Sequence, residues 1–175
     1  LTLAATLFYV FVYTIWLKRS TPQNIVIGGA AGSIPPLVGW AAITGGLGLP
    51  ALYLFAIIFF WTPPHFWALA LLIQEDYEQA NIPMLPVVVG SNRTARSIFL
   101  YVLALVVITL MLALTSSVGW LYFAAALMLG GLLIGLAGRL IHQPGIRRAK
   151  QLYLYSLLYL ALLFVVMMVD STLAL

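Results

Sequence analysis

Six long apolar runs make up most of this 175-residue chain. A helix needs about 20 mainly apolar residues to cross the hydrocarbon core of a bilayer. Strands of a membrane barrel instead alternate in polarity over about ten residues, which these continuous runs do not. We therefore expect an all-α polytopic membrane protein with a single transmembrane domain over residues 1–175. The six predicted transmembrane helices cover residues 1–17, 24–43, 50–73, 98–115, 118–138 and 152–169.

The scarcity of charge supports a membrane protein and limits the kinds of site that the chain can build. Charged residues make up 7% of it, whereas soluble domains carry about 25%. It contains no cysteine, which excludes disulfide frameworks, thiolate metal sites and cysteine nucleophiles. The net charge of +4 is spread along an apolar chain, so we interpret it as a topology signal and expect no nucleic-acid partner. Because Leu1 already lies inside an apolar run, we interpret the chain as N-terminally truncated.

All eight Lys and Arg residues lie in three of the five connections between the runs, 18–23, 74–97 and 139–151. The other two connections, 44–49 and 116–117, carry no charge. By alternation, the three charged connections lie on one side of the membrane. An excess of Lys and Arg marks the cytoplasmic side. We expect the charged loops in the cytoplasm, with lipid around the helices, in a bacterial cytoplasmic (inner) membrane rather than a mitochondrial one.

Two proline pairs, Pro35-Pro36 and Pro63-Pro64, fall inside the second and third apolar runs. Proline lacks an amide donor and its ring clashes with the preceding helical turn, so each pair is expected to break its helix. Backbone freed at membrane depth is tolerated where it faces protein or a wet cavity. We therefore expect two kinked helices that splay apart and leave a pocket open to the cytoplasmic side.

His65 directly follows the second proline pair. An ionisable group inside a membrane span is a functional-site hypothesis by default; the alternative is a neutral histidine bonded to a freed carbonyl. If the helix continues, His65 and Asp76 share one face of it, about 16 Å apart along the axis. This layout suits a substrate with a charged head at the membrane surface and a reactive part in the apolar zone.

Three of the four acidic residues, Glu75, Asp76 and Glu78, lie close together after the third run. Acidic residues contribute little to membrane orientation, so this clustering needs another explanation. Mg²⁺ takes one or two carboxylates together with substrate phosphates, and nearby Lys and Arg bind phosphate oxygens. The mixture predicts a metal–pyrophosphate site, where stabilising the leaving group would release a carbocation.

Aromatic faces could stabilise such a cation. Most Trp and Tyr residues in membrane helices are instead interface anchors, so both interpretations stay open. Tyr153, Tyr155 and Tyr159 are interpreted as interface or packing residues. The candidates for cation stabilisation are Tyr13, Trp61, Phe66, Trp67 and Tyr101.

Three strings of residues resemble a known family. They are similar to strings in the protohaem IX farnesyltransferases (haem O synthases), a branch of the UbiA-type intramembrane prenyltransferases. The resemblance is dense over residues 13–101 and follows the helix pattern beyond. The strings are Tyr13-Thr14-x-x-Leu17-Lys18-Arg19-x-Thr21-Pro22-x-Asn24, then Trp61-x-Pro63-Pro64-His65-Phe66-Trp67-Ala68-Leu69-Ala70, and Asp76-Tyr77-x-x-Ala80-x-Ile82-Pro83-Met84-Leu85-Pro86.

The resemblance implies a nine-helix bundle, of which the chain would hold helices four to nine. It implies transfer of farnesyl from farnesyl diphosphate to a vinyl group of haem b, with water addition giving haem O. Mg²⁺ would be the cofactor, haem b a substrate, and haem A synthase a partner. In the family two acid-rich motifs hold the metal and the diphosphate; the second corresponds to Asp76 and its neighbours, and the first is absent. The fragment alone is therefore expected to be inactive.

The resemblance also implies roles for single residues. Ala80 stands where the wider superfamily often has a second acid, which leaves Glu75 or Glu78 as substitutes. Asn24 either bonds a phosphate or caps its helix. The catalytic candidates are Tyr13, Lys18, Arg19 and Asp76; the metal candidates are Asp76 and Glu75; the substrate-binding candidates are Asn24, Trp61, His65, Phe66 and Arg93.

Three other functions remain open. A prenyltransferase acting on an aromatic quinone precursor shares the Mg²⁺–diphosphate chemistry but does not explain the Pro63-Pro64-His65-Phe66-Trp67 string. A transporter would also use broken helices and an intramembrane histidine, but the acids lie near one surface and no inverted repeat is visible. A haem-handling membrane protein would bind haem without Mg²⁺ or diphosphate.

Overall fold

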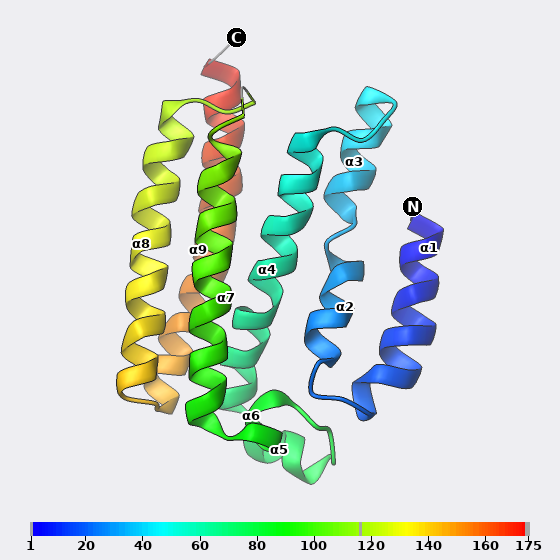
Figure 1. The fold of residues 1–175 in the computed structure, drawn as a ribbon, viewed down its shortest axis with the longest axis vertical. Helices are drawn as coiled ribbons and strands as arrows, with labels where there is room; N and C mark the ends of the chain where they lie inside the picture. The colour runs from blue at the N-terminus through cyan, green and yellow to red at the C-terminus, as the bar shows by residue number, and fades with distance from the viewer. Residues whose placement is uncertain (1, 116, 174–175) are drawn as a thin grey trace.

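The computed structural model describes residues 2–115 and 117–173, and every regular element in this part of the chain is a helix (Figure 1). Leu1 and Ser116, which fall in the first predicted run and in the 116–117 connection, lie outside the described residues. The elements are α1 (Thr2–Leu7), the π-helix η1 (Phe8–Trp16), the 3-10 helix η2 (Leu17–Arg19), α2 (Asn24–Gly32), α3 (Pro35–Thr44), α4 (Leu49–Leu72), α5 (Gln74–Gln79), α6 (Leu85–Val89), α7 (Ser91–Leu112), α8 (Trp120–His142) and α9 (Ile146–Leu173).

Five helical segments of the described chain are long and apolar enough to cross a membrane. They are Asn24–Thr44, which combines α2 and α3, together with α4, α7, α8 and most of α9. The expected first span is helical as well, but it divides into α1, η1 and η2. It is not among the five segments that meet the criterion of length and apolarity. Five of the six expected spans are therefore confirmed in the described part of the chain, and the first stays a prediction.

Three of the helices extend well beyond the apolar runs that predicted them. Helix α7 begins at Ser91, directly after Gly90, whose φ of +80° suits glycine. Arg93 and Arg96 therefore lie on a helix and not in a loop. Helices α8 and α9 likewise continue toward each other, leaving only residues 143–145 between them. Apolarity marks the lipid-facing length of a helix, whereas hydrogen bonding carries the helix on into water.

The two proline pairs have different outcomes. The chain is interrupted before Pro35 and Pro36, which occupy the first positions of α3, where a missing N–H costs nothing. This break confirms the prediction. Pro63 and Pro64 instead lie inside the continuous helix α4, so the predicted break there is wrong. Each interior proline costs about 3 kcal/mol, but α4 packs against α2, α3, α7 and α9, and this burial holds it helical.

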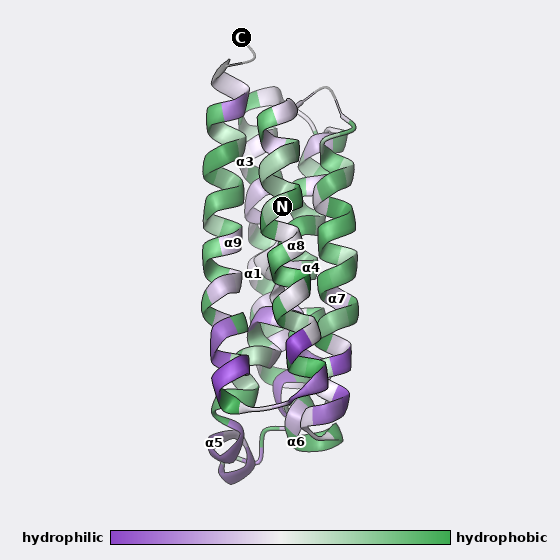
Figure 2. Cartoon of the chain, turned by 90° about the vertical axis from the view of Figure 1, so that its left-hand side faces the viewer, coloured by the Kyte–Doolittle hydropathy of each residue, from purple (hydrophilic) through white to green (hydrophobic). Residues whose placement is uncertain are grey.

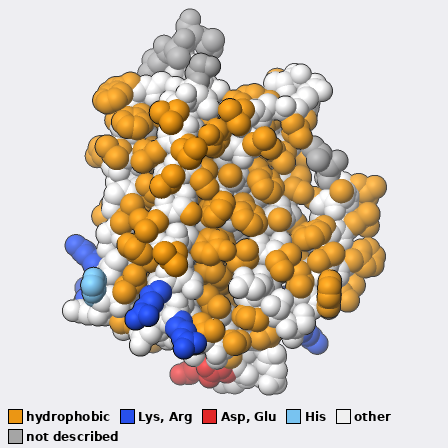
Figure 3. Space-filling model, in the orientation of Figure 1, with side chains coloured by type: hydrophobic (Ala, Val, Ile, Leu, Met, Phe, Trp, Pro, Cys, Tyr) orange, Lys and Arg blue, Asp and Glu red, His pale blue; other side chains and the backbone are white. Residues whose placement is uncertain are grey.

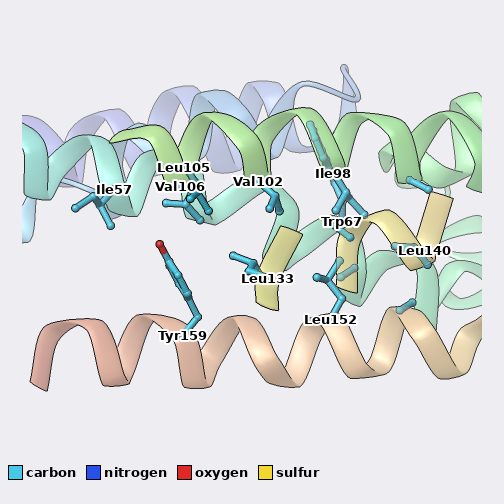
Figure 4. Packing of buried hydrophobic residues seen from close by; sticks show 14 of the residues in the cluster. Ile57, Trp67, Ile98, Val102, Leu105, Val106, Leu133, Leu140, Leu152 and Tyr159 are labelled. Carbon is cyan, nitrogen blue, oxygen red and sulfur yellow. The ribbon is translucent and has the colours of Figure 1, made fainter. Parts of the chain in front are cut away.

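The core lies between α4, α7, α8 and α9, each of which contacts the next in the order α4, α7, α8, α9 and back to α4. Figure 4 shows the facing side chains, among them Val102, Leu133 and Tyr159. The hydroxyl of Tyr159 lies 2.8 Å from that of Thr109, so a polar pair is satisfied inside this apolar interface. Helices α2 and α3 pack on the outer side of α4, with η1 against α2.

Polar and charged residues gather at one end of the bundle. Figure 2 shows the hydrophilic segments at the end that carries α5 and α6, and Figure 3 shows Lys, Arg, Asp and Glu side chains at the same end, below an apolar face. The connections after η1, α4 and α8 all lie there (Figure 1). The prediction that the three charged connections share one side is confirmed.

Candidate functional site

The acidic residues lie on α5, a short helix at the charged end of the bundle. Helix α4 ends because Ile73 leaves the helical region, with φ −121° and ψ 37°. Glu75 and Asp76 then occupy the first turn of α5, where carboxylates interact favourably with the helix dipole. Together with Glu78 they line a pocket of about 570 Å³, closed on its other side by the end of α4, Ser91 of α7 and the connection between α8 and α9.

The break at Ile73 changes the predicted relation between His65 and Asp76. The two side chains share a face only if one uninterrupted helix runs from His65 to Asp76. Because α4 ends at Leu72 and α5 begins at Gln74, helical spacing no longer relates the two side chains, and the shared-face expectation is wrong. The acidic residues lie on α5 at the charged end of the bundle, whereas His65 lies within α4.

The three carboxylates of the pocket are not equivalent. Gln74 donates to Glu78 across 2.7 Å, and Ser91 approaches Gln74 at 3.5 Å, so Glu78 is tied into a local chain of hydrogen bonds. Glu75 and Asp76 are exposed toward the pocket. Among residues 2–115 and 117–173, no group of three or more His, Asp or Glu side chains is placed to hold a metal ion. One or two carboxylates suffice for Mg²⁺ when phosphates and water supply its other ligands, so Glu75 and Asp76 fit part of a Mg²⁺–diphosphate site.

The segment after α5 anchors the acidic helix to the bundle. Asn81 adopts a left-handed φ of 51°, a conformation that Asn tolerates better than most residues. The chain then turns back, with the N–H of Ile82 donating to the carbonyl of Tyr77 at 3.0 Å. Met84, Leu85 and Pro86 are buried beyond it. The Ile-Pro-Met-Leu-Pro string therefore has a packing role that holds α5 in place.

Lys18 and Arg19 are exposed on η2, and neither lines the acidic pocket. Asn24 follows at the start of α2 and is only 1% exposed. Its side-chain N–H donates to the carbonyl of Lys18 at 3.3 Å, and its Oδ1 is buried without a hydrogen-bond partner. Asn24 makes no capping bond to α2, so the capping alternative is wrong. Its side chain instead fixes the backbone that carries Lys18.

Tyr13 projects from the π-helix η1 onto the backbone of α2. A Cβ atom built on Gly28 would lie 2.5 Å from Cε2 and 2.9 Å from Cγ of Tyr13, so the ring rests on a surface that only glycine provides. Tyr9 packs on it at a centroid distance of 5.1 Å. Tyr13 is therefore positioned by close packing from two helices, although it does not line the acidic pocket.

Arg93 lies in the first turn of α7 and is exposed. Ser91, two residues earlier, lines the acidic pocket. Residues two positions apart on a helix point to nearly opposite sides, so Arg93 faces away from the pocket. The structure thus gathers Glu75, Asp76 and Glu78 around one pocket and leaves the predicted cations outside it.

His65 is 6% exposed and lies at the interface between α4 and α9. Its Nδ1 is 2.7 Å from the hydroxyl oxygen of Ser156. Trp61 stacks on one side of the imidazole, at a centroid distance of 4.3 Å, and Tyr153 stacks on it at 4.8 Å. The freed-carbonyl alternative is wrong, because the partner of His65 is a side chain of another helix.

Both aromatic substrate-binding candidates, Trp61 and Phe66, contact His65. Trp61 donates its indole N–H to the backbone carbonyl of Ser156 at 2.8 Å. Phe66 meets the imidazole edge-on at 5.2 Å but is itself 38% exposed. The sequence did not predict that Ser156 or Tyr153 contacts His65. The available signal was a serine hydroxyl inside the otherwise apolar run 152–169, which needs a partner at membrane depth.

The family comparison agrees with this all-helical architecture. The model of the UbiA prenyltransferase family matches residues 1–167. The chain belongs to the UbiA prenyltransferase family. No solved structure matches the chain.

Similar proteins from bacteria narrow the comparison within the UbiA family. The chain is 59% identical over 165 residues to the protoheme IX farnesyltransferase of Gloeobacter violaceus, covering 94% of the chain and 54% of that protein. It is 57% identical over 170 residues to an enzyme of the same name from Thermus thermophilus, covering 97% of the chain and 28% of that protein. It is 55% identical over 176 residues to the protoheme IX farnesyltransferase of Deinococcus radiodurans, covering 97% of the chain and 56% of that protein. The chain thus spans about half, or less, of the curated relatives it matches.

Proposed function

We propose that the protein containing this chain transfers the farnesyl group of farnesyl diphosphate to a vinyl group of haem b. Pyrophosphate leaves as the farnesyl cation forms; after the vinyl group attacks that cation, water adds to the resulting haem cation and loses a proton, giving haem O. The names of the similar proteins support the reaction class. The single observation that carries the proposal is the acidic pocket of α5 at the charged end of an otherwise apolar bundle, because it suits an ionic leaving group on a lipid-soluble substrate.

Glu75 and Asp76 would hold Mg²⁺ together with the diphosphate oxygens, and the remaining carboxylates would come from elsewhere in the protein. Bound Mg²⁺ supplies charge neutralisation for the departing pyrophosphate. Glu78, tied to Gln74, supports the orientation of α5. The segment that carries Lys18 and Arg19, η2, lies at the same end of the bundle, where the two cations would neutralise charge on a diphosphate that extends beyond the acidic pocket.

His65 would orient the haem from α4, deeper in the bundle than the acids. Trp61 and Phe66 contact the imidazole and would offer flat apolar surface to the porphyrin. Tyr13, held on Gly28, would direct its hydroxyl toward the diphosphate or its ring toward the allylic cation. A dry apolar cavity protects that cation from early capture by water. The vinyl group, as the electron-rich partner, forms the new carbon–carbon bond.

The charged end is proposed to lie in the cytoplasm of a bacterium, because all eight Lys and Arg residues are in the connections and helix ends found there. Farnesyl diphosphate would then reach the acidic pocket from the cytoplasmic side. Cysteines introduced singly at exposed positions of this end should be labelled by a membrane-impermeant thiol reagent only after the cytoplasmic face is made accessible. Labelling from outside intact cells would contradict the orientation.

The substrate test uses the full-length protein in liposomes with Mg²⁺ and farnesyl diphosphate, offered either haem b or an aromatic carboxylic acid. Mass spectrometry of the products should show a farnesylated, hydrated haem and no prenylated aromatic acid. Transfer to the aromatic acid alone would favour the quinone-precursor function. Haem binding with no transfer would favour a haem-handling protein, and flux without chemistry would favour a transporter; either result would refute the proposal.

A further inference from the structure

His65 and Ser156, 91 positions apart in sequence, form a buried hydrogen bond that joins α4 to α9. The serine oxygen makes two short contacts, one of 2.7 Å to Nδ1 of His65 and one of 2.7 Å to the backbone carbonyl of Tyr153. A serine hydroxyl has one proton to donate and can also accept. The carbonyl can only accept, so the serine proton belongs on the contact to Tyr153.

This proton count determines the tautomer of the histidine. With its only proton directed at the carbonyl of Tyr153, the Ser156 oxygen must accept a hydrogen bond from Nδ1–H of His65. The reverse assignment would leave two oxygens 2.7 Å apart with no proton between them. A neutral imidazole has one N–H, so Nε2 of His65 carries a free lone pair.

Ser156 also controls the orientation of the ring. Its backbone carbonyl accepts the indole N–H of Trp61 at 2.8 Å, which places the indole on the imidazole at 4.3 Å, nearly parallel at 16°. Tyr153 stacks on the same imidazole at 26°. One residue of α9 thereby fixes both the proton position and the stacking of His65.

The Nε2 atom of His65 is not among the fully buried polar atoms that lack a partner. In the described part of the chain, the fully buried side-chain nitrogen and oxygen atoms without a partner are Asn24 Oδ1 and Trp67 Nε1. The hydrogen bond of the His65 side chain is made through Nδ1. Nε2 therefore keeps some exposed surface, and its lone pair has no hydrogen-bond partner in the described part of the chain.

We propose that Ser156 is a positioning residue, which holds His65 as the Nδ1–H tautomer and presents Nε2 as a ligand atom for the iron of a porphyrin. Histidines that bind metals generally donate their other N–H to a fixed acceptor, which sets the tautomer and raises the basicity of the ligand nitrogen. The inference rests on the proposed function for the identity of the ligand. The tautomer itself follows from the hydrogen bonds.

The test measures the tautomer before any haem is added. The full-length protein, labelled with ¹³C and ¹⁵N in histidine, is studied by solid-state NMR in lipid bilayers, and the His65 signal is assigned by its loss in His65→Gln. The wild-type protein should show the Nδ1–H form at neutral pH. Ser156→Ala should convert a large part of the population to the Nε2–H form, and Ser156→Thr, which keeps a hydroxyl, should restore the wild-type signal.

Ser171→Ala is the matched control, because Ser171 also lies on α9 and its hydroxyl also bonds the carbonyl three residues earlier, at 2.9 Å. It should leave the His65 signal unchanged. Titration with haem b, followed by its absorption spectrum, should then show roughly 10–100-fold weaker binding in Ser156→Ala than in Ser171→Ala.

Four results distinguish failure of the inference from failure of the proposed function. An Nε2–H tautomer in the wild type, or a Ser156→Ala signal identical to wild type, would overturn the inference while leaving the proposed function intact. Equal haem affinity in Ser156→Ala and Ser171→Ala would also overturn it. A wild-type protein with the Nδ1–H tautomer that binds no haem would support the tautomer assignment and refute the proposed function.

Discussion

Gly28→Ala should displace Tyr13 and lower turnover without unfolding the bundle. The new Cβ would lie 2.5 Å from Cε2 of Tyr13, whereas ordinary contact begins at 3.4 Å, so the ring must move by roughly 1 Å. Overpacking of this kind costs about 1–3 kcal/mol of stability. A misplacement of about 1 Å at a reacting group can cost 10²-fold in rate. We expect a modest loss of thermal stability and a loss of roughly 10–100-fold in kcat.

The assay combines thermal unfolding in detergent with farnesyl transfer to haem b in liposomes, both on the full-length protein. Gly32→Ala is the control, because Gly32 lies one turn further along α2 and its new Cβ would have no atom within 4 Å apart from its chain neighbours and the backbone of its own helix. Exchanging Gly for Ala there should be neutral or stabilise by up to ~1 kcal/mol. Adding Tyr13→Ala to Gly28→Ala should recover stability but not turnover. Unchanged kcat in Gly28→Ala would refute the placement of Tyr13 at the reaction site.

Two further predictions concern stability. Asp170 is 5% exposed and accepts hydrogen bonds from two backbone N–H groups at the start of α8, so Asp170→Asn should lower the unfolding free energy by about 1–3 kcal/mol, measured by thermal unfolding in detergent; an unchanged midpoint would contradict this. Burial raises the pKa of Tyr77 above its ordinary value of 10. The stability that the neutral Tyr77 side chain contributes to the fold is therefore intact below pH 10, and it is lost as the pH rises through the raised pKa. Tyr77→Phe should remove that part of the alkaline loss of stability, and identical alkaline profiles for both proteins would contradict it.

The membrane class, the shared end of the charged connections and the existence of five spans could be predicted, because they depend on apolar length and on the placement of charge. The ends of the helices could not. Helix α7 starts seven residues before the predicted run, at Ser91 rather than at residue 98, because helical hydrogen bonding does not stop where the apolar residues stop. The proline rule correctly predicted the break before Pro35 but not the continuity at Pro63, where packing from four helices outweighs local propensity.

The residue types of the candidate site could be predicted from the sequence, but the contacts between residues of different helices could not. The acidic residues of α5 stand together in the sequence, so their shared pocket follows from local chain geometry. The contact of Tyr13 with Gly28 and the bond of His65 to Ser156 join separate helices. Such pairs depend on how helices pack, which no local pattern encodes. The same limit explains why the helix end at Ile73, set by one pair of dihedral angles, removed the predicted face shared by His65 and Asp76.

The proposed function assigns diphosphate and haem to separate parts of one enzyme, the diphosphate to the acidic residues of α5 and the haem to His65 of α4. The most direct measurement is the binding of farnesyl diphosphate, with Mg²⁺, and of haem b to full-length Asp76→Asn and His65→Ala. Gln79→Ala is the control, because Gln79 is an exposed residue of α5 that does not line the acidic pocket. Asp76→Asn should lose diphosphate affinity and keep haem affinity, His65→Ala should do the reverse, and Gln79→Ala should stay close to wild type in both. If Asp76→Asn and His65→Ala each lost both ligands, or only lowered the amount of folded protein, the two-site account would be contradicted.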